Sequence, residues 1–172
     1  MEIERYKTVA FTGYRTHKIL RPGIPVAVLE NIRCELKTVL RKLYGEGYRV
    51  FLSGMAEGFD LLAAEEVLLL KREFSDVKLI GVLPFRKQAL KYSRSDRERY
   101  ESILKECSFV ELLSEQYYKG CYFARNDFLV EHCSVIICYY DGQKGGTEYT
   151  VKRAGEAGIP VINLYDKIFG LF

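Results

Sequence analysis

The sequence predicts one α/β domain, in which a mainly parallel sheet of about six strands carries helices on both faces. Apolar, β-branched runs alternate about six times with longer segments of helical period. Several of these runs are almost continuously hydrophobic, which is typical of strands that helices cover on both sides. The connecting segments are short, and no linker rich in Pro, Gly or Ser divides the chain. Such alternation favours right-handed βαβ units and therefore a Rossmann-like, doubly wound fold over residues 1–172.

The predicted strands are short runs rich in Val, Ile, Leu, Phe and Tyr, and they cover residues 8–12, 49–53, 77–83, 109–113, 135–140 and 159–164. The helices predicted between them cover residues 26–44, 59–74, 96–107, 122–132 and 147–157. The first helix is the clearest, because Val28, Ile32, Leu36 and Leu40 fall on one stripe. The second helix is rich in Ala and Leu, the third is charged, the fourth is aromatic and apolar, and the fifth follows a glycine pair.

The composition is that of an ordinary globular domain: 172 residues suit one core, 48% are hydrophobic and 28% are charged. Neither the charged first residues nor any later stretch shows the apolar run of a signal peptide or a membrane span. We therefore expect a cytoplasmic protein without a membrane partner. The net charge of +3 gives no general attraction to nucleic acid.

The cysteines and histidines form no metal-binding or disulfide pattern. The five cysteines are an odd number and have no CxxC spacing. We expect reduced thiols, with Cys133 and Cys138 buried as small apolar side chains rather than acting as metal ligands. His17 and His132 have no carboxylate or second histidine at ligand spacing, so the sequence predicts no metal site.

Glycine-rich turns follow three of the predicted strands, at the sheet edge where parallel sheets bind ligands. Their sequences are TGYR at 12–15, SGMAEGFD at 53–60 and DGQKGGTE at 141–148. Backbone N–H groups that glycine leaves open, together with helix N-termini, are well suited to hold phosphate oxygens. The turns therefore predict a phosphate site that includes Gly13, Ser53, Gly54, Gly58, Gly145, Gly146 and Thr147. The alternative is that the glycines only permit tight turns and close contacts between helices and strands.

Polar side chains near these turns have a functional and a structural interpretation. Arg15 suits bidentate contact with a phosphate or carboxylate, or a surface ion pair. Arg125 and Asn126 line a pocket or solvate the start of a helix. Asp60 and Glu148 either accept hydrogen bonds from ribose hydroxyls or stabilise helix N-termini, and Glu148 is also placed to approach a reacting C1′ atom.

Aromatic residues supply two further candidates. Tyr14 and Tyr140 lie beside the same turns and could stack on a base. The segment 85–105 combines many basic residues with Tyr92 and Tyr100. It is interpreted as a solvated helix face, or as a mobile flap over the ligand or a patch that contacts single-stranded nucleic acid.

Four ordered blocks of sequence resemble those of the SLOG superfamily, which joins the DNA-processing protein DprA (Smf) to the LOG phosphoribohydrolases. The blocks are FTGYR, FLSGMAEGFDLLAAE, YFARNDFLVEHCSVIICYY and GGTEYTVKRAGEAGIPVI, and they span about residues 8–164. The likeness is greatest to the YpsA-like branch of small bacterial proteins. It implies a Rossmann-like sheet and a ligand site built from Gly13, Arg15, Ser53, Gly54, Gly58, Asp60, Arg125, Asn126, Gly145, Gly146 and Thr147.

The chain departs from the LOG pattern PGGxGTxxE, whose Glu is catalytic in those enzymes. Lys144 stands at the place of the Pro, and Thr150 stands where the catalytic Glu would be. Glu148 is the remaining candidate for a catalytic carboxylate. The resemblance therefore favours binding of a nucleotide derivative by a sensing or regulatory module over hydrolysis of its N-glycosidic bond.

Other functions remain as alternatives. Single-stranded DNA binding, as in DprA-like proteins, is weakened by the modest net charge. A purely structural or partner-binding role is also open. A small-molecule nucleotide derivative is the expected ligand, no cofactor is identified, and the sequence does not decide whether the protein forms homo-oligomers.

Overall fold

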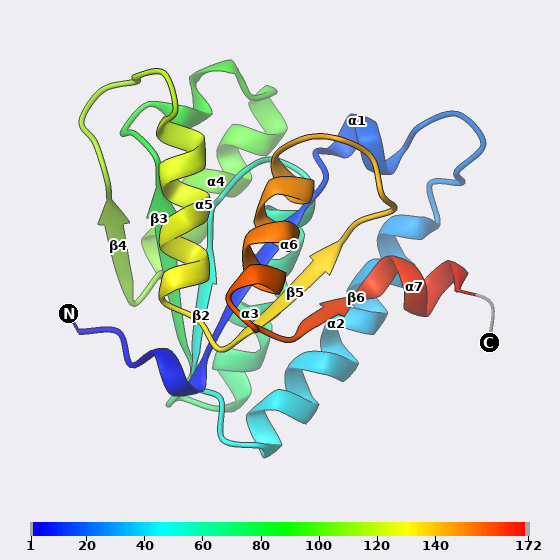
Figure 1. Cartoon of the computed structure of the whole chain (residues 1–172), viewed down its shortest axis with the longest axis horizontal. Coiled ribbons are helices and arrows are strands. Elements are labelled where there is room, and N and C mark those ends of the chain that lie inside the picture. Colours follow the sequence, from blue (N-terminus) through cyan, green and yellow to red (C-terminus); the bar gives the residue numbers. More distant parts are fainter. Residues whose placement is uncertain (1, 171–172) are drawn as a thin grey trace.

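The computed structural model describes residues 2–170 and contains one six-stranded sheet with the strand order β4-β3-β2-β1-β5-β6 (Figure 1). Each recorded strand pair is parallel. The strands are β1 (Thr8–Gly13), β2 (Val50–Ser53), β3 (Lys78–Leu83), β4 (Phe109–Leu112), β5 (Val135–Tyr139) and β6 (Val161–Asn163). The predicted Rossmann-like, doubly wound parallel sheet is therefore confirmed.

Helices cover both faces of this sheet. They are α1 (Thr16–Ile19), α2 (Val28–Gly45), α3 (Phe59–Glu73), α4 (Arg94–Glu106), α5 (Cys121–Glu131), α6 (Gly146–Glu156) and α7 (Leu164–Phe169), with 3-10 turns η1 (Arg5–Lys7) and η2 (Gln88–Lys91). Alternate strand residues point to opposite faces, so Val9 and Phe11 pack in one core and Ala10 in the other. The first core lies under α2, α3 and α4, and the second lies under α5 and α6, which stand in front of the sheet in Figure 1.

Most predicted elements begin and end within about two residues of the observed ones. The last strand is the main difference, since β6 ends at Asn163 and Leu164 already belongs to α7. The Asn163 side chain explains this boundary: it accepts a hydrogen bond from the Tyr165 N–H at 3.2 Å and so caps α7. The sequence did not predict α1, α7 or the two 3-10 turns, which are too short to show a clear hydrophobic period.

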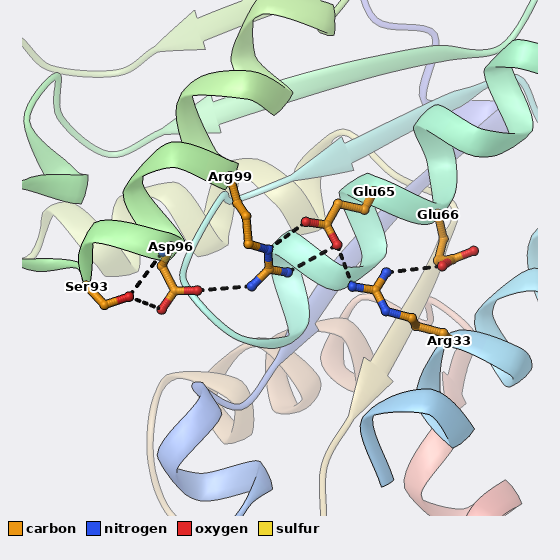
Figure 2. Close-up of polar contacts among 6 residues, drawn as sticks. All are labelled: Arg33, Glu65, Glu66, Ser93, Asp96 and Arg99. Atoms are coloured by element: carbon orange, nitrogen blue, oxygen red, sulfur yellow. Dashed lines mark hydrogen bonds and ion pairs between the residues drawn. The ribbon is translucent and has the colours of Figure 1, made fainter. Parts of the chain in front are cut away.

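A network of charged side chains fastens α4 to α3 and α2 (Figure 2). Arg99 of α4 contacts Glu65 of α3 at 2.6 Å and Asp96 at 3.0 Å, while Arg33 of α2 reaches the same Glu65 at 2.6 Å. Burial acts to raise the pKa of Glu65, but hydrogen bonds from both arginines outweigh it and lower the pKa. Ser93 caps α4 by accepting the Asp96 N–H. Arg99 thus attaches the basic segment 85–105 to α3.

Two cysteines are buried as the sequence predicts, Cys133 just before β5 and Cys138 within it. Cys133 and Cys138 are fully buried, and burial raises the pKa of each to about 12. Both are free thiols among the described residues.

Within residues 2–170, no helix has the length and apolar character that crossing a membrane requires.

Candidate functional site

A cavity of about 390 Å³ opens at the carboxyl ends of β1 and β5. These strands are neighbours, yet the chain continues from β1 to β2 on one side and from β5 to β6 on the other. Such a topological switch point is where open α/β sheets bind ligands. Of the sequence-predicted residues, the cavity is lined by Gly13, Tyr14, Arg15, Asp60, Arg125, Asn126, Gly146 and Thr147. Ser53, Gly54, Gly58, Gly145 and Glu148 lie outside this lining set.

The N-terminus of α6 faces the cavity through Gly146 and Thr147. Gly145 precedes the helix with a φ of 147° and, being glycine, has no side chain to accept an N–H of the first turn. Within the described residues, no acceptor is recorded for the N–H groups of Gly146 and Thr147. Open N–H groups and the positive end of the helix dipole are together suited to hold an anion.

The Glu148 carboxylate makes its contacts on the surface of α6. Its carboxylate pairs with Lys152 at 2.9 Å, one turn along α6. This hydrogen bond from Lys152, together with one from the Gly145 N–H, lowers the pKa of Glu148. Glu148 therefore closes a capping interaction with Gly145, which is the structural role that the sequence left open. At the position of the LOG glutamate, Thr150 is buried and donates to the Gly146 carbonyl at 3.0 Å.

Contacts from α1 and its flanking residues hold the turn between β5 and α6. The Asp141 carboxylate accepts the Tyr14 hydroxyl and pairs with Arg21, while Lys18 donates to the Lys144 carbonyl at 3.0 Å. Burial, followed by the hydrogen bond to Asp141, raises the pKa of Tyr14 to about 12. The Tyr14 ring is buried, and the Tyr140 ring packs edge-on against it. Tyr14 thus orders this turn.

The turn between β2 and α3 satisfies some of its hydrogen-bonding groups with the residues that flank it. Ser53 donates to the Asp60 carbonyl and accepts the Met55 N–H, and the Ala56 N–H donates to the Asp60 carboxylate at 3.3 Å. Gly58 has a φ of 96°, and a Cβ there would lie 2.6 Å from the Tyr14 carbonyl oxygen. This turn packs closely against the backbone that follows β1. The acceptors recorded for its N–H groups are protein atoms.

Gly13 and Gly54 also permit close approach of neighbouring groups. A Cβ on Gly13 would overlap the Phe59 ring, and one on Gly54 would lie 2.5 Å from the Arg125 guanidinium. The glycine at position 54 therefore makes room for Arg125, which donates to the Gly54 carbonyl at 2.5 Å. Asn126 accepts a second hydrogen bond from Arg125 at 2.8 Å and so orients the guanidinium.

Asp60 supplies a buried acceptor inside the cavity. It is 5% exposed, and its Oδ1 atom has no hydrogen-bond partner within residues 2–170. Burial raises the pKa of Asp60 to about 6, although the charge of the nearby Arg125 acts to lower it. Buried carboxyl oxygens are usually hydrogen-bonded, so this one suits a donor that residues 2–170 do not supply, such as a water molecule or a ligand hydroxyl.

The structure adds lining residues that the sequence did not indicate as site residues. They are Phe11 and Thr12 from β1, His17 and Lys18 from α1, Tyr122, Phe123 and Leu129 from α5, and Ala56 from the turn after β2. The FTGYR block points to the start of α1, but no periodic signal marks this four-residue helix. Its position near the β5–α6 turn arises from the Lys18–Lys144 contact, which joins residues far apart in sequence.

Two solved structures of DNA processing protein A have the same fold as this chain. For the Streptococcus pneumoniae protein the TM-score is 0.59 at 21% identity, with 91% of this chain and 49% of that one covered. For the Helicobacter pylori protein the TM-score is 0.60 at 21% identity, with 90% and 63% covered. The chain therefore spans about half the length of the pneumococcal protein.

Sequence comparison identifies nearer relatives. A UPF0398 protein of Bacillus thuringiensis (strain Al Hakam) is 31% identical over 173 aligned positions, covering 96% of this chain and 91% of that protein. The model of the YspA SLOG family matches residues 9–158, which include the cavity-lining residues and the three glycine-rich turns. This chain belongs to the YspA SLOG family.

Proposed function

We propose that this protein binds a nucleotide or nucleotide derivative in the cavity at the ends of β1 and β5, as a sensing or regulatory module. One observation carries the proposal: an open helix N-terminus, a buried arginine and an unpartnered buried carboxyl oxygen line a single cavity at the switch point of the sheet. Phosphate requires donors and positive charge, whereas a sugar hydroxyl requires an acceptor. A phosphorylated sugar presents both.

Each wall of the cavity has a distinct role in this proposal. The N–H groups of Gly146 and Thr147 hold phosphate oxygens, and Arg15 adds a charge-assisted hydrogen bond. Arg125 has five N–H donors, of which the recorded bonds use two, so it has others to offer. Asp60 accepts a hydroxyl hydrogen through Oδ1.

The geometry supports binding over hydrolysis through Glu148. A catalytic acid or base must come within hydrogen-bonding reach of the reacting atoms. Glu148 is instead paired with Lys152 and bonded to the Gly145 N–H, and it lies outside the residues that line the cavity. Asp60 is the carboxylate that lines it.

Single-stranded DNA binding is a second candidate. It is favoured by the fold likeness to DNA processing protein A of Helicobacter pylori, which has a single-stranded DNA binding mode. The basic side chains of Arg15, Lys18 and Arg125 at one cavity suit a phosphate from either source. Binding to a strand would weaken steeply with added salt, because each neutralised phosphate releases counterions.

The decisive experiment identifies the ligand and locates its site. Native mass spectrometry of purified protein reports any small molecule that co-purifies, and thermal unfolding against a panel of nucleotides reports binding. A ligand at one hundred times its Kd raises the free energy of unfolding by about 2.7 kcal/mol. We expect this gain in the native chain and its loss in Arg15→Ala and Gly146→Val.

Matched controls separate the site from general stability. Gly155→Val alters a glycine of the same helix that has open space around it, and Arg72→Ala removes an exposed arginine of α3. Both should keep the ligand-induced gain. Equal gains in Arg15→Ala, Gly146→Val and the native chain would refute this site. Release of free base from nucleoside monophosphates would instead establish hydrolysis.

A further inference from the structure

A second cavity adjoins the first and is more than twice as large, at about 1030 Å³ compared with 390 Å³. The two cavities share Arg15, His17 and Tyr122 as lining residues. They are therefore adjacent, and Arg15 lies at their boundary. The first cavity is of the size expected for one small polar ligand, so the second provides room for a considerable extension of that ligand.

Aromatic rings form one wall of the second cavity. Phe85 packs edge-on against Tyr117 and Tyr122, with ring centroids 5.5 and 5.9 Å apart. Tyr117 is nevertheless 63% exposed, so much of its ring is free to contact a ligand. Exposed aromatic faces beside basic side chains are the usual platform on which nucleobases stack.

The charge on the cavity walls favours an anionic ligand. Lys87 and Lys91 line the cavity from η2 and the residues before it, and no ion pair is recorded for either within residues 2–170. Both acidic residues that line the cavity already contact other protein groups. Glu57 accepts both the N–H and the hydroxyl of Thr16, and Asp96 pairs with Arg99 in the network of Figure 2. Glu57 keeps its negative charge, but Arg15, Lys87 and Lys91 outnumber it, so the net charge of the lining is positive.

Contacts within the protein hold the walls of the second cavity in place. Arg86 makes two hydrogen bonds to Glu115, at 2.7 and 2.6 Å, and so ties the turn after β3 to the segment that carries Tyr117. Tyr92 donates to the Met55 carbonyl at 3.0 Å. Gln88 donates at 3.3 Å to the Gly54 carbonyl, which also accepts Arg125 of the first cavity. The Gly54 carbonyl thus holds one lining residue of each cavity.

We propose that the second cavity is a subsite for a second nucleotide unit, joined through phosphate to the one bound in the first cavity. This inference rests on the proposed function. Arg15 holds the linking phosphate, because it lines both cavities and has no recorded side-chain partner among residues 2–170. Lys87 and Lys91 add charge, and the second base stacks on Tyr117. The ligand is then a free dinucleotide or the end of a strand.

Calorimetry with paired ligands tests the subsite. The probes are nucleoside 5′-monophosphates and 5′-phosphorylated dinucleotides of each base. A stacked base contributes about 1–3 kcal/mol, so the dinucleotide should bind about 5–150-fold more tightly than its monophosphate. Tyr117→Ala should remove at least about 5-fold of this advantage, and Lys87→Ala a smaller part, while monophosphate affinity stays unchanged in both variants.

Neighbouring residues outside the cavity provide the controls. Tyr118, which is 47% exposed, and Lys119 lie next to Tyr117 in sequence but do not line the cavity. Tyr118→Ala and Lys119→Ala should leave the dinucleotide advantage intact. Equal affinity of the native chain for both probes would overturn the second subsite and leave the proposed function standing. No binding of either probe would overturn the proposed function itself.

An eight-nucleotide strand distinguishes the two sources of the ligand. Affinity equal to or below that of the dinucleotide identifies a free dinucleotide as the ligand. Affinity more than about 10-fold higher, with a steep dependence on salt, identifies the end of a strand. Together with the losses in Tyr117→Ala and Lys87→Ala, an affinity no higher than that of the dinucleotide supports a small-molecule subsite. A much higher affinity for the strand supports a nucleic-acid subsite at the same residues.

Discussion

Two glycine-rich turns leave the same edge of the sheet, yet they differ in what their backbone groups do. In the turn between β2 and α3, the N–H groups of Met55 and Ala56 donate to side chains of the turn itself. In the turn between β5 and α6, those of Gly146 and Thr147 face the cavity without a recorded acceptor among residues 2–170. The two sequences suggest the same phosphate-binding role, but the surroundings of the two turns differ.

The difference follows from what packs behind each turn. Gly58 lies against the backbone of residues 14–16, so this glycine is needed for close approach. Around Gly146 the nearest group to an added Cβ would be the Asn126 amide at 3.7 Å, which is an ordinary contact. A glycine-rich turn can therefore serve packing or ligand binding, and the distance to its neighbours decides which.

The largest expected effect comes from Gly58→Ala. At a φ of 96° the substitution strains the backbone, and its Cβ would lie 2.6 Å from a carbonyl oxygen. We expect a loss of roughly 3–5 kcal/mol in the free energy of unfolding, measured by urea denaturation. Gly142→Ala is the matched control, because Gly142 has a φ of 97° and open space around it. Its loss should be near 1 kcal/mol, and equal losses would contradict the packing role of Gly58.

The next effect concerns Asp60 and pH. Its pKa in the folded protein is raised from 3.8 to about 6, so the folded state holds this proton more tightly than the unfolded state. Its contribution to stability therefore falls as pH rises from about 4 to about 6, by roughly 2–3 kcal/mol at most. This slope should be absent from Asp60→Asn in denaturant unfolding at a series of pH values.

A bound nucleotide should alter the same slope. A hydroxyl that donates to the Asp60 carboxylate stabilises its charged form and lowers its pKa. With saturating ligand, the fall in stability of the native chain between pH 4 and 6 should therefore be smaller. Asp60→Asn with and without ligand serves as the control, and an unchanged slope in the native chain would argue against contact between ligand and Asp60.

The smallest expected effect comes from Glu148→Gln. The change weakens the ion pair with Lys152 and the capping of α6, both at the protein surface. We expect the melting temperature to fall by no more than about 3 °C, with nucleotide affinity unchanged in calorimetry. Lys152→Met should have a similar effect on stability. A large loss of ligand affinity in Glu148→Gln alone would restore this carboxylate to the binding or catalytic machinery.

Many of the residues that line the cavity could be predicted from the sequence. The sequence could not distinguish them from residues of the same type that lie outside the cavity. Asp60 and Glu148 look alike in sequence, since both carboxylates stand in the first turn of a helix that follows glycine. Only Asp60 lines the cavity, because Lys152 and the Gly145 N–H hold Glu148 on the helix surface. Arg125 is a similar case, since its burial depends on the space left by Gly54, 71 positions earlier.

The sequence alone determined the alternation of strands and helices, because hydrophobic period and turn residues act over a few neighbouring positions. It also determined which turns reach the ligand-binding edge, since carboxyl ends of parallel strands meet there. Only the tertiary structure decided which N–H groups stay open, which carboxylate is buried without a partner, and how Arg15 joins two cavities. These features depend on contacts between residues far apart in the chain, such as Lys18 with Lys144 and Gln88 with Gly54, which leave no local pattern to read.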